Sequence, residues 1–193
     1  TYILPALVAN LLRVQSRIAE SELIEQALIL GRLFKQEFFL WQTEADFSEQ
    51  IKQTLSFFQQ QQLCHCTKAG YWSVEETSDA RFSLTVLSSA VDETLQRYAI
   101  VLSLLQSETQ FSRAALEKDT LTMAKRLSTI HNINGPEFVD KKAQAVLIQS
   151  LREQNYIIAD DQGNLVASET MPALTGIIFN LIDTEVIQSI KLH

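Results

Sequence analysis

The sequence predicts a mainly α-helical fold with two small β-hairpins. Apolar residues recur at spacings of three and four over long stretches, which is typical of amphipathic helices. Only five Gly and three Pro interrupt 193 residues, and these are the residues that most often break regular structure. In two short segments, at about 63–75 and about 156–168, the apolar pattern instead has the period of two that indicates strands.

The first part of the chain is predicted to hold three helices. An apolar stretch covers residues 3–12, which is well short of the roughly 20 residues needed to span a bilayer. Ser21 is predicted to cap a second helix that runs to about residue 34. Asp46 and Glu49 have the spacing of a capping box, so a third helix should begin there and end in the glutamine run at 59–62.

The first hairpin and a long helix come next. Residues 63–66 and 71–74 are predicted to pair across a turn at 68–70 that contains a glycine. A long helix is then expected over about 79–105, because its apolar periodicity continues without Gly or Pro.

The last part of the chain is predicted to repeat this order of elements. Ser112 is expected to cap the next helix, and Pro136 to begin another that ends near Gln154. The second hairpin follows, with its turn at 160–164, and a final helix starts at Pro172.

A helix that leads into a hairpin therefore occurs twice, at 47–74 and at 136–167. This is a weak structural repeat of the winged-helix type, although helix plus hairpin is also a common packing unit that can recur by coincidence. We expect two helical subdomains, residues 1–110 and 111–193, each with one hairpin and each a winged-helix-like half.

The charge of the chain is acidic but uneven. The formal net charge is −7, which argues against general nucleic-acid binding because that affinity comes mainly from Lys and Arg. Residues 111–152 contain seven basic and four acidic side chains, so this segment carries +3 and the remainder −10.

Five basic side chains of this segment are candidates for a partner or membrane surface. They could form a cationic patch that faces an acidic protein or lipid headgroups. The alternative is an ordinary solvated helix face whose charges pair locally. The five residues are Lys118, Lys125, Arg126, Lys141 and Lys142.

No catalytic, metal or cofactor site is predicted from the residues themselves. Cys64, His65 and Cys66 lack the second ligand pair that a structural zinc site requires. The two common glycine-rich patterns that bind phosphate, Gly-x-Gly-x-x-Gly and Gly-x-x-x-x-Gly-Lys-Ser/Thr, do not occur in the sequence. The two cysteines do not make a disulfide framework, which fits a reducing cytosolic setting.

Arg97 lies in an otherwise apolar part of the long helix. A half-buried arginine requires a carboxylate partner, and Asp92, Glu93 and Glu117 are the candidates. We expect a structural ion pair between Arg97 and Glu93.

Several blocks of the sequence resemble the C-terminal region of the bacterial membrane-associated glycerol-3-phosphate acyltransferase. They occur in order over nearly the whole chain. The blocks are Leu4-Pro5 with the apolar residues 6–9, Glu93 to Ile100, Leu116-Glu117-Lys118, Arg126-Leu127-Ser128, His131, Pro136-Glu137-Phe138, Asp140-Lys141 and Glu169-Thr170-Met171.

The resemblance implies an enzyme that transfers a fatty acyl group from acyl carrier protein or acyl-CoA to sn-glycerol 3-phosphate in phospholipid biosynthesis. It implies a location at the cytoplasmic face of the bacterial inner membrane for the parent enzyme, with this part itself soluble. In that family a His-x-x-x-x-Asp motif supplies the general base and the group that orients it.

This chain departs from the catalytic motifs of the family. Five residues after His65 comes Gly70, and five after His131 comes Pro136. The family also has a Pro-Glu-Gly type motif that helps hold the phosphate. Residues 135–138 share only Pro-Glu with it and have Phe138 at the position of its Gly. We therefore expect a non-catalytic C-terminal domain, inactive alone, whose catalytic part precedes Thr1.

The expected partners follow from this interpretation. They are the N-terminal catalytic domain of the same enzyme, acyl carrier protein and, through the parent enzyme, the membrane surface; no nucleic acid and no cofactor are expected. Two other functions remain open at this point: a winged-helix-like module that binds DNA or protein, and a helical oligomerisation domain.

Overall fold

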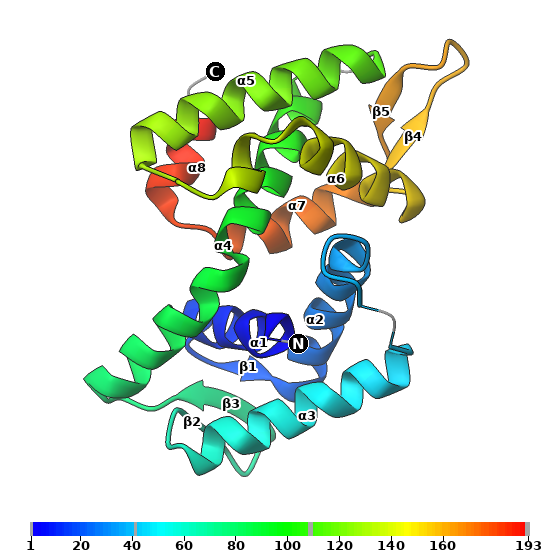
Figure 1. Cartoon of the computed structure of the whole chain (residues 1–193). Coiled ribbons are helices and arrows are strands. Elements are labelled where there is room, and N and C mark those ends of the chain that lie inside the picture. Colours follow the sequence, from blue (N-terminus) through cyan, green and yellow to red (C-terminus); the bar gives the residue numbers. More distant parts are fainter. Residues whose placement is uncertain (1, 41, 108–109, 192–193) are drawn as a thin grey trace. The chain divides into compact units, whose positions relative to one another are not determined.

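A computed structural model of the chain describes residues 2–40, 42–107 and 110–191. It confirms a mainly α-helical fold with two small antiparallel sheets (Figure 1). The internal contacts divide the chain into two compact units, Thr1–Asp92 and Glu93–His193. The predicted boundary between residues 110 and 111 lies beyond this point, and as a statement about domains it stays a prediction.

The first unit contains three helices, a three-stranded sheet and the start of a long helix. Its elements are α1 (Ile3–Val14), β1 (Ile18–Ala19), α2 (Glu20–Phe34), α3 (Glu44–Gln60), β2 (Cys64–Cys66), β3 (Tyr71–Val74) and the first part of α4 (Ser78–Ser107).

Helix α1 forms the centre of this unit. It contacts α2, α3 and β3, and Figure 1 shows it lying among these elements. Val8, Ala9 and Leu11 are fully buried, as expected of a helix that is apolar on every side. Its buried polar residue, Asn10, donates a hydrogen bond of 3.0 Å to Oδ1 of Asp92.

Two predicted helix caps in this unit are wrong. Helix α2 begins one residue earlier than Ser21, since β1 leads directly into it and Ala19 is its N-cap. Helix α3 begins before Asp46: Thr43 is the N-cap, and its Oγ1 accepts the backbone N–H of Asp46 at 3.2 Å. Oγ1 of Thr43 also donates to Oδ2 of Asp46 at 2.7 Å, so the cap lies three residues earlier than the predicted capping box of Asp46 and Glu49.

The first predicted hairpin is confirmed as β2 and β3, which pair antiparallel. The sheet also contains β1, giving the order β1-β3-β2. Gly70 takes a positive φ of 77° in the hairpin turn, a conformation that favours glycine. Buried Trp72 fixes the sheet to α2, because its Nε1–H donates to Oε2 of Glu20 at 3.0 Å.

The second unit contains the end of α4 and the remaining elements. These are α5 (Arg113–His131), the 3₁₀ helix η1 (Pro136–Val139), α6 (Lys141–Glu153), β4 (Ile157–Ala159), β5 (Leu165–Ala167), α7 (Met171–Asn180) and α8 (Thr184–Lys191).

Two predicted helices of the second unit are each divided. The helix predicted from Pro136 breaks at Asp140, whose side chain accepts the N–H of Ala143 at 2.8 Å and so caps α6. The final helix is divided between Asn180 and Thr184. Ser112 caps α5 as predicted, accepting the N–H of Ala115 at 3.1 Å.

The second hairpin is confirmed as β4 and β5. Phe111 adds an antiparallel bridge to Leu165 of β5, so the second sheet has the same order of connections as the first. In each unit a helix is followed by a strand or bridge, further helices and a hairpin. Each unit therefore follows a winged-helix-like path.

Candidate functional site

The five predicted basic residues lie on two helices that contact each other. Lys118, Lys125 and Arg126 belong to α5 and Lys141 and Lys142 to α6, and α5 packs against η1 and α6. The four lysines are exposed, and Arg126 is half-buried.

Two of the basic residues of α5 lie on the same side of the helix. Lys118 and Lys125 are separated by seven residues, or about two turns, so they share one side of the helix. Among the described residues neither has an ion-pair partner, whereas Arg113 at the start of α5 pairs with Glu117 at 2.9 Å.

Lys141 and Lys142 occupy the first two positions of α6, after the N-cap Asp140. The helix dipole is positive at this end, so cations there cost about 0.3–1 kcal/mol where carboxylates would stabilise the helix. Their placement therefore does not stabilise α6.

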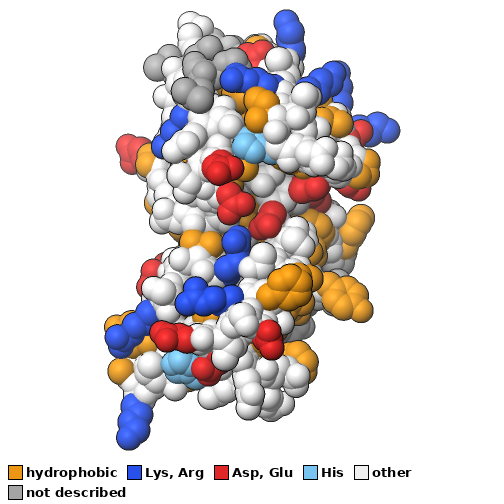
Figure 2. All heavy atoms as spheres, turned by 90° about the vertical axis from the view of Figure 1, so that its left-hand side faces the viewer, with side chains coloured by type: hydrophobic (Ala, Val, Ile, Leu, Met, Phe, Trp, Pro, Cys, Tyr) orange, Lys and Arg blue, Asp and Glu red, His pale blue; other side chains and the backbone are white. Residues whose placement is uncertain are grey.

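The surface around basic side chains is mixed rather than uniformly positive. Figure 2 shows Lys and Arg side chains interspersed with Asp and Glu side chains over the face it presents. An anionic partner that approached this face would therefore meet separate cationic side chains rather than one continuous positive patch.

The two sequence blocks that carry most of the family resemblance meet in the second unit. Glu93 in α4 places its carboxylate against Gly135, where an added Cβ would collide with it. Arg97 is 1% exposed and donates from Nη2 to Oγ1 of Thr94 at 3.0 Å. The ion pair between Arg97 and Glu93 stays a prediction.

The described histidines have hydrogen-bond partners, and His193 lies outside the described residues. Nδ1 of His65 lies 3.0 Å from Oε1 of Glu75. Nε2 of His131 lies 2.9 Å from Oγ of Ser189, which donates its proton to the carbonyl of Glu185 at 3.0 Å. The His131 ring therefore donates to Ser189, and this contact ties α5 to α8 without forming a nucleophile.

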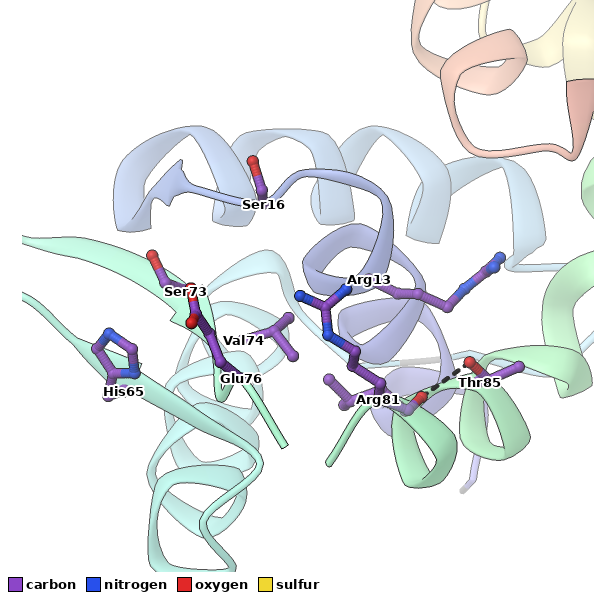
Figure 3. Close-up of a pocket in the computed structure, with 9 residues that line it drawn as sticks. Arg13, Ser16, His65, Ser73, Val74, Glu76, Arg81 and Thr85 are labelled. Atoms are coloured by element: carbon purple, nitrogen blue, oxygen red, sulfur yellow. Dashed lines mark hydrogen bonds between the residues drawn. The ribbon is translucent and has the colours of Figure 1, made fainter. Parts of the chain in front are cut away.

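A polar pocket of about 440 Å³ in the first unit was not predicted from the sequence. Its lining residues come from α1 and the following turn, the sheet, and α4. No local sequence signal could have found it, since these segments are far apart in the chain. Figure 3 shows the residues Arg13, Ser16, His65, Ser73, Val74, Glu76, Arg81 and Thr85, which line it together with Leu84.

The pocket does not assemble a catalytic pair. In Figure 3 the Arg81 side chain extends from α4 into the space between Ser16 and Glu76, while Arg13 is directed away. His65 and Ser73 are cross-strand partners, but within the part of the chain that is described no hydrogen bond joins their side chains. A serine nucleophile would require that contact.

The cysteines near this pocket differ in exposure. Cys64 is buried and Cys66 is exposed. Burial, with Glu75 and Cys66 adding to it, raises the pKa of the Cys64 thiol to about 12. Because the thiolate is the reactive form, Cys64 is unsuited to nucleophilic chemistry near neutral pH.

Two general features of the described residues complete the geometry. They contain no group of three or more His, Cys, Asp or Glu side chains arranged to hold a metal ion. Among them, no helix is both long enough and apolar enough to cross a membrane.

Comparison with known proteins decides the family. Residues 1–160 match the model of the glycerol-3-phosphate acyltransferase C-terminal region. The chain belongs to this family. The match covers the signature blocks around Glu93 to Ile100 and Gly135 to Phe138, so this C-terminal region keeps them in one folded unit.

Two curated relatives extend the match to nearly the whole chain. The glycerol-3-phosphate acyltransferase of Colwellia psychrerythraea is 39% identical over 190 residues, which cover 98% of this chain and 23% of that protein. That of Aeromonas hydrophila is 35% identical over 190 residues, with the same coverage of 98% and 23%. The chain thus spans about a quarter of the length of these relatives.

Proposed function

We propose that this chain is the non-catalytic C-terminal region of an enzyme that transfers a fatty acyl group to sn-glycerol 3-phosphate. The acyl donor would be acyl carrier protein or acyl-CoA, and the whole enzyme would act in phospholipid biosynthesis at the cytoplasmic face of the inner membrane. The N-terminal catalytic part of the same enzyme is its first partner.

One observation carries this proposal. The chain belongs to a family defined by the C-terminal region of these acyltransferases, yet neither His65 nor His131 has an Asp five residues later. Acyl transfer to a hydroxyl requires a general base. In this proposal the base belongs to the rest of the enzyme, and the described histidines hold the local fold together.

The proposal is tested by separating the chain from its parent. Residues 1–193 alone should show no acyl transfer to glycerol 3-phosphate, while the full-length enzyme should be active. Activity of the isolated chain would contradict the non-catalytic role.

His65 offers a sharper version of this test, because it lies 3.0 Å from the carboxylate of Glu75 and could be mistaken for a base. In the full-length enzyme, His65→Ala should leave kcat within about twofold, whereas loss of a general base costs roughly 10²- to 10⁴-fold. A loss in that range would assign chemistry to this unit.

The basic residues of α5 and α6 are proposed to contact an acidic partner, for which acyl carrier protein is the candidate. The support is their exposure and the position of two lysines at the N-terminus of α6. Reversing Lys118, Lys125, Lys141 and Lys142 to Glu leaves half-buried Arg126 in place. We expect the apparent KM for acyl carrier protein substrates to rise roughly tenfold, since exposed charge pairs contribute about 0.2–1 kcal/mol each.

A matched variant controls for net charge. Reversing the exposed basic residues Arg17, Lys52, Lys68 and Arg81 of the first unit changes the charge by the same amount and should leave that KM unchanged. The effect on the α5 and α6 residues should weaken as salt is added. Equal KM values for the two variants would remove acyl carrier protein as the partner of this surface.

DNA binding is not favoured as an alternative. The turn of the first hairpin carries Lys68 alone among basic residues, and the second carries Asp160 and Asp161. A hairpin that enters a nucleic-acid groove would need cations at these positions.

A further inference from the structure

An apolar groove of about 480 Å³ lies in the first unit between α1, α3 and α4. It differs from the polar pocket of Figure 3 in carrying no charged residue among those that line it. The lining residues are Tyr2, Leu4, Pro5, Gln50, Gln53, Thr54, Phe57, Phe58, Leu63 and Leu87.

Two of the polar side chains at this groove have partners within α3. Oγ1 of Thr54 donates to the carbonyl of Gln50 at 2.8 Å, and Nε2 of Gln53 donates to Glu49 at 3.3 Å. What the groove offers to a ligand is therefore mainly apolar surface, so it does not select phosphate groups or an acidic protein.

Two large apolar side chains of the groove are exposed. Tyr2 is 91% exposed and Phe57 is 55% exposed, although the neighbouring Phe58 is buried at 2%. Contiguous apolar surface of this kind commonly marks an interaction site. Amphipathic segments of polypeptide commonly bind by laying their apolar face into a hydrophobic groove between helices.

We propose that the polypeptide immediately preceding Thr1 in the full-length enzyme packs its apolar side chains into this groove. The inference rests on the proposed function, in which this chain is the C-terminal region of a longer enzyme. Its curated relatives are about four times as long, since the chain spans 23% of each.

The position of Tyr2 selects this occupant. It comes at the start of α1 and is itself part of the groove lining, so the preceding residues are attached at the groove. A segment tethered at that point has an effective concentration in the millimolar range, which favours it over free ligands of similar apolar character.

Site-specific cross-linking in the full-length enzyme tests the inference. Photoreactive benzoylphenylalanine in place of Phe57 should cross-link to a peptide from the segment that precedes Thr1 in the same molecule. The matched control is the same replacement at Phe82, which is 71% exposed in α4 and does not line the groove; it should give no such peptide. Cross-links from position 57 to a second copy, to lipid or to another part of the enzyme, or none, would overturn the inference.

A pair of variants gives an independent measure of the contact. Phe57→Glu should expose the preceding segment and increase its cleavage by protease roughly ten- to hundredfold, the factor expected when the burial of one large apolar side chain is lost. Phe82→Glu should leave cleavage unchanged. Equal cleavage rates for the two variants would contradict the packing proposed here.

The outcomes also separate this inference from the proposed function. Activity of the isolated chain would refute the non-catalytic role whatever covers the groove. A full-length enzyme that is active, with an inactive isolated chain and no cross-link from position 57, would leave the proposed function standing and refute only the docking of the preceding segment.

Discussion

The two units follow the same path through helices and a hairpin but fill their interiors differently. The described part of the first unit buries Asn10 and Ser88 as its polar residues. The second buries Thr94, Arg97, Thr120, Gln144, Ser150 and Thr175. The same order of elements can therefore be stabilised by a nearly apolar core or by one that contains a buried charge.

The surfaces of the two units also differ in polarity. The first unit, with the more apolar core, exposes the apolar groove around Phe57. The second presents the basic residues of α5 and α6. The two proposals therefore assign a different partner to each unit, and the following predictions test the interiors of the two units.

The largest expected effect is at Arg97. Arg97→Ala should lower the free energy of unfolding by about 2–5 kcal/mol, because it leaves a cavity where a long, fully buried side chain packs and removes the hydrogen bond to Thr94. Arg97→Met should cost less, since an apolar side chain of similar length avoids both the cavity and the buried charge. Chemical denaturation of the isolated chain measures both, and a loss below about 1 kcal/mol for the alanine variant would contradict a structural role for the buried arginine.

Two glycines give a comparison of intermediate size. A Cβ at Gly31 in α2 would lie 2.6 Å from the ring of Phe47, which is 6% exposed. Gly31→Ala should therefore cost about 1–3 kcal/mol, as overpacking of a core does. Adding Phe47→Leu should restore part of that loss, and a double variant no more stable than Gly31→Ala would show that the ring is not the obstacle.

Gly135→Ala should cost less than Gly31→Ala. The group it meets is the carboxylate of Glu93, the far end of a flexible side chain that can move aside. We expect less than about 1 kcal/mol, within the range of ordinary surface changes. A larger loss in the same denaturation experiment would mean that the position of Glu93 is itself important, as an ion pair with Arg97 would require.

The smallest effect concerns the thiols of the first unit. In the folded chain at pH 8, a thiol reagent should modify exposed Cys66 and leave Cys64 unmodified. In the folded state the pKa of the Cys64 thiol is about 12, against a usual value of 9.0, so the thiol keeps its proton to higher pH than in the unfolded chain. The contribution of Cys64 to stability is therefore intact below pH 9 and falls as the pH rises from about 9 toward 12. Cys64→Ala should abolish that part of the pH dependence, and rapid labelling of both thiols at pH 8 would contradict it.

The comparison of the units also shows which features a sequence can predict. Long periodic stretches predicted the helices α3, α4 and α5, because burial of an apolar stripe dominates their stability. The hairpins followed from the period of two and from turn glycines such as Gly70 and Gly163, both of which have positive φ.

The missed features depend on short or distant contacts. Strand β1 has two residues, too few to show a period, and Asp140 interrupts an apolar pattern that continues on both sides of it. Arg97 is different, because its apolar neighbours in the sequence did predict that it is at least half-buried. The contact of His131 with Ser189 joins residues 58 positions apart, and the sequence carries no local signal of it.

Helix α1 has a mechanical consequence. It is surrounded by α2, α3 and β3 and has no solvent-facing side along most of its length, so it cannot peel away from the surface as an outer helix can. A force applied to the N-terminal end of the chain would act directly on the packed interior of the first unit. That unit should therefore resist tension up to a threshold and then unfold in one step, rather than lengthen gradually.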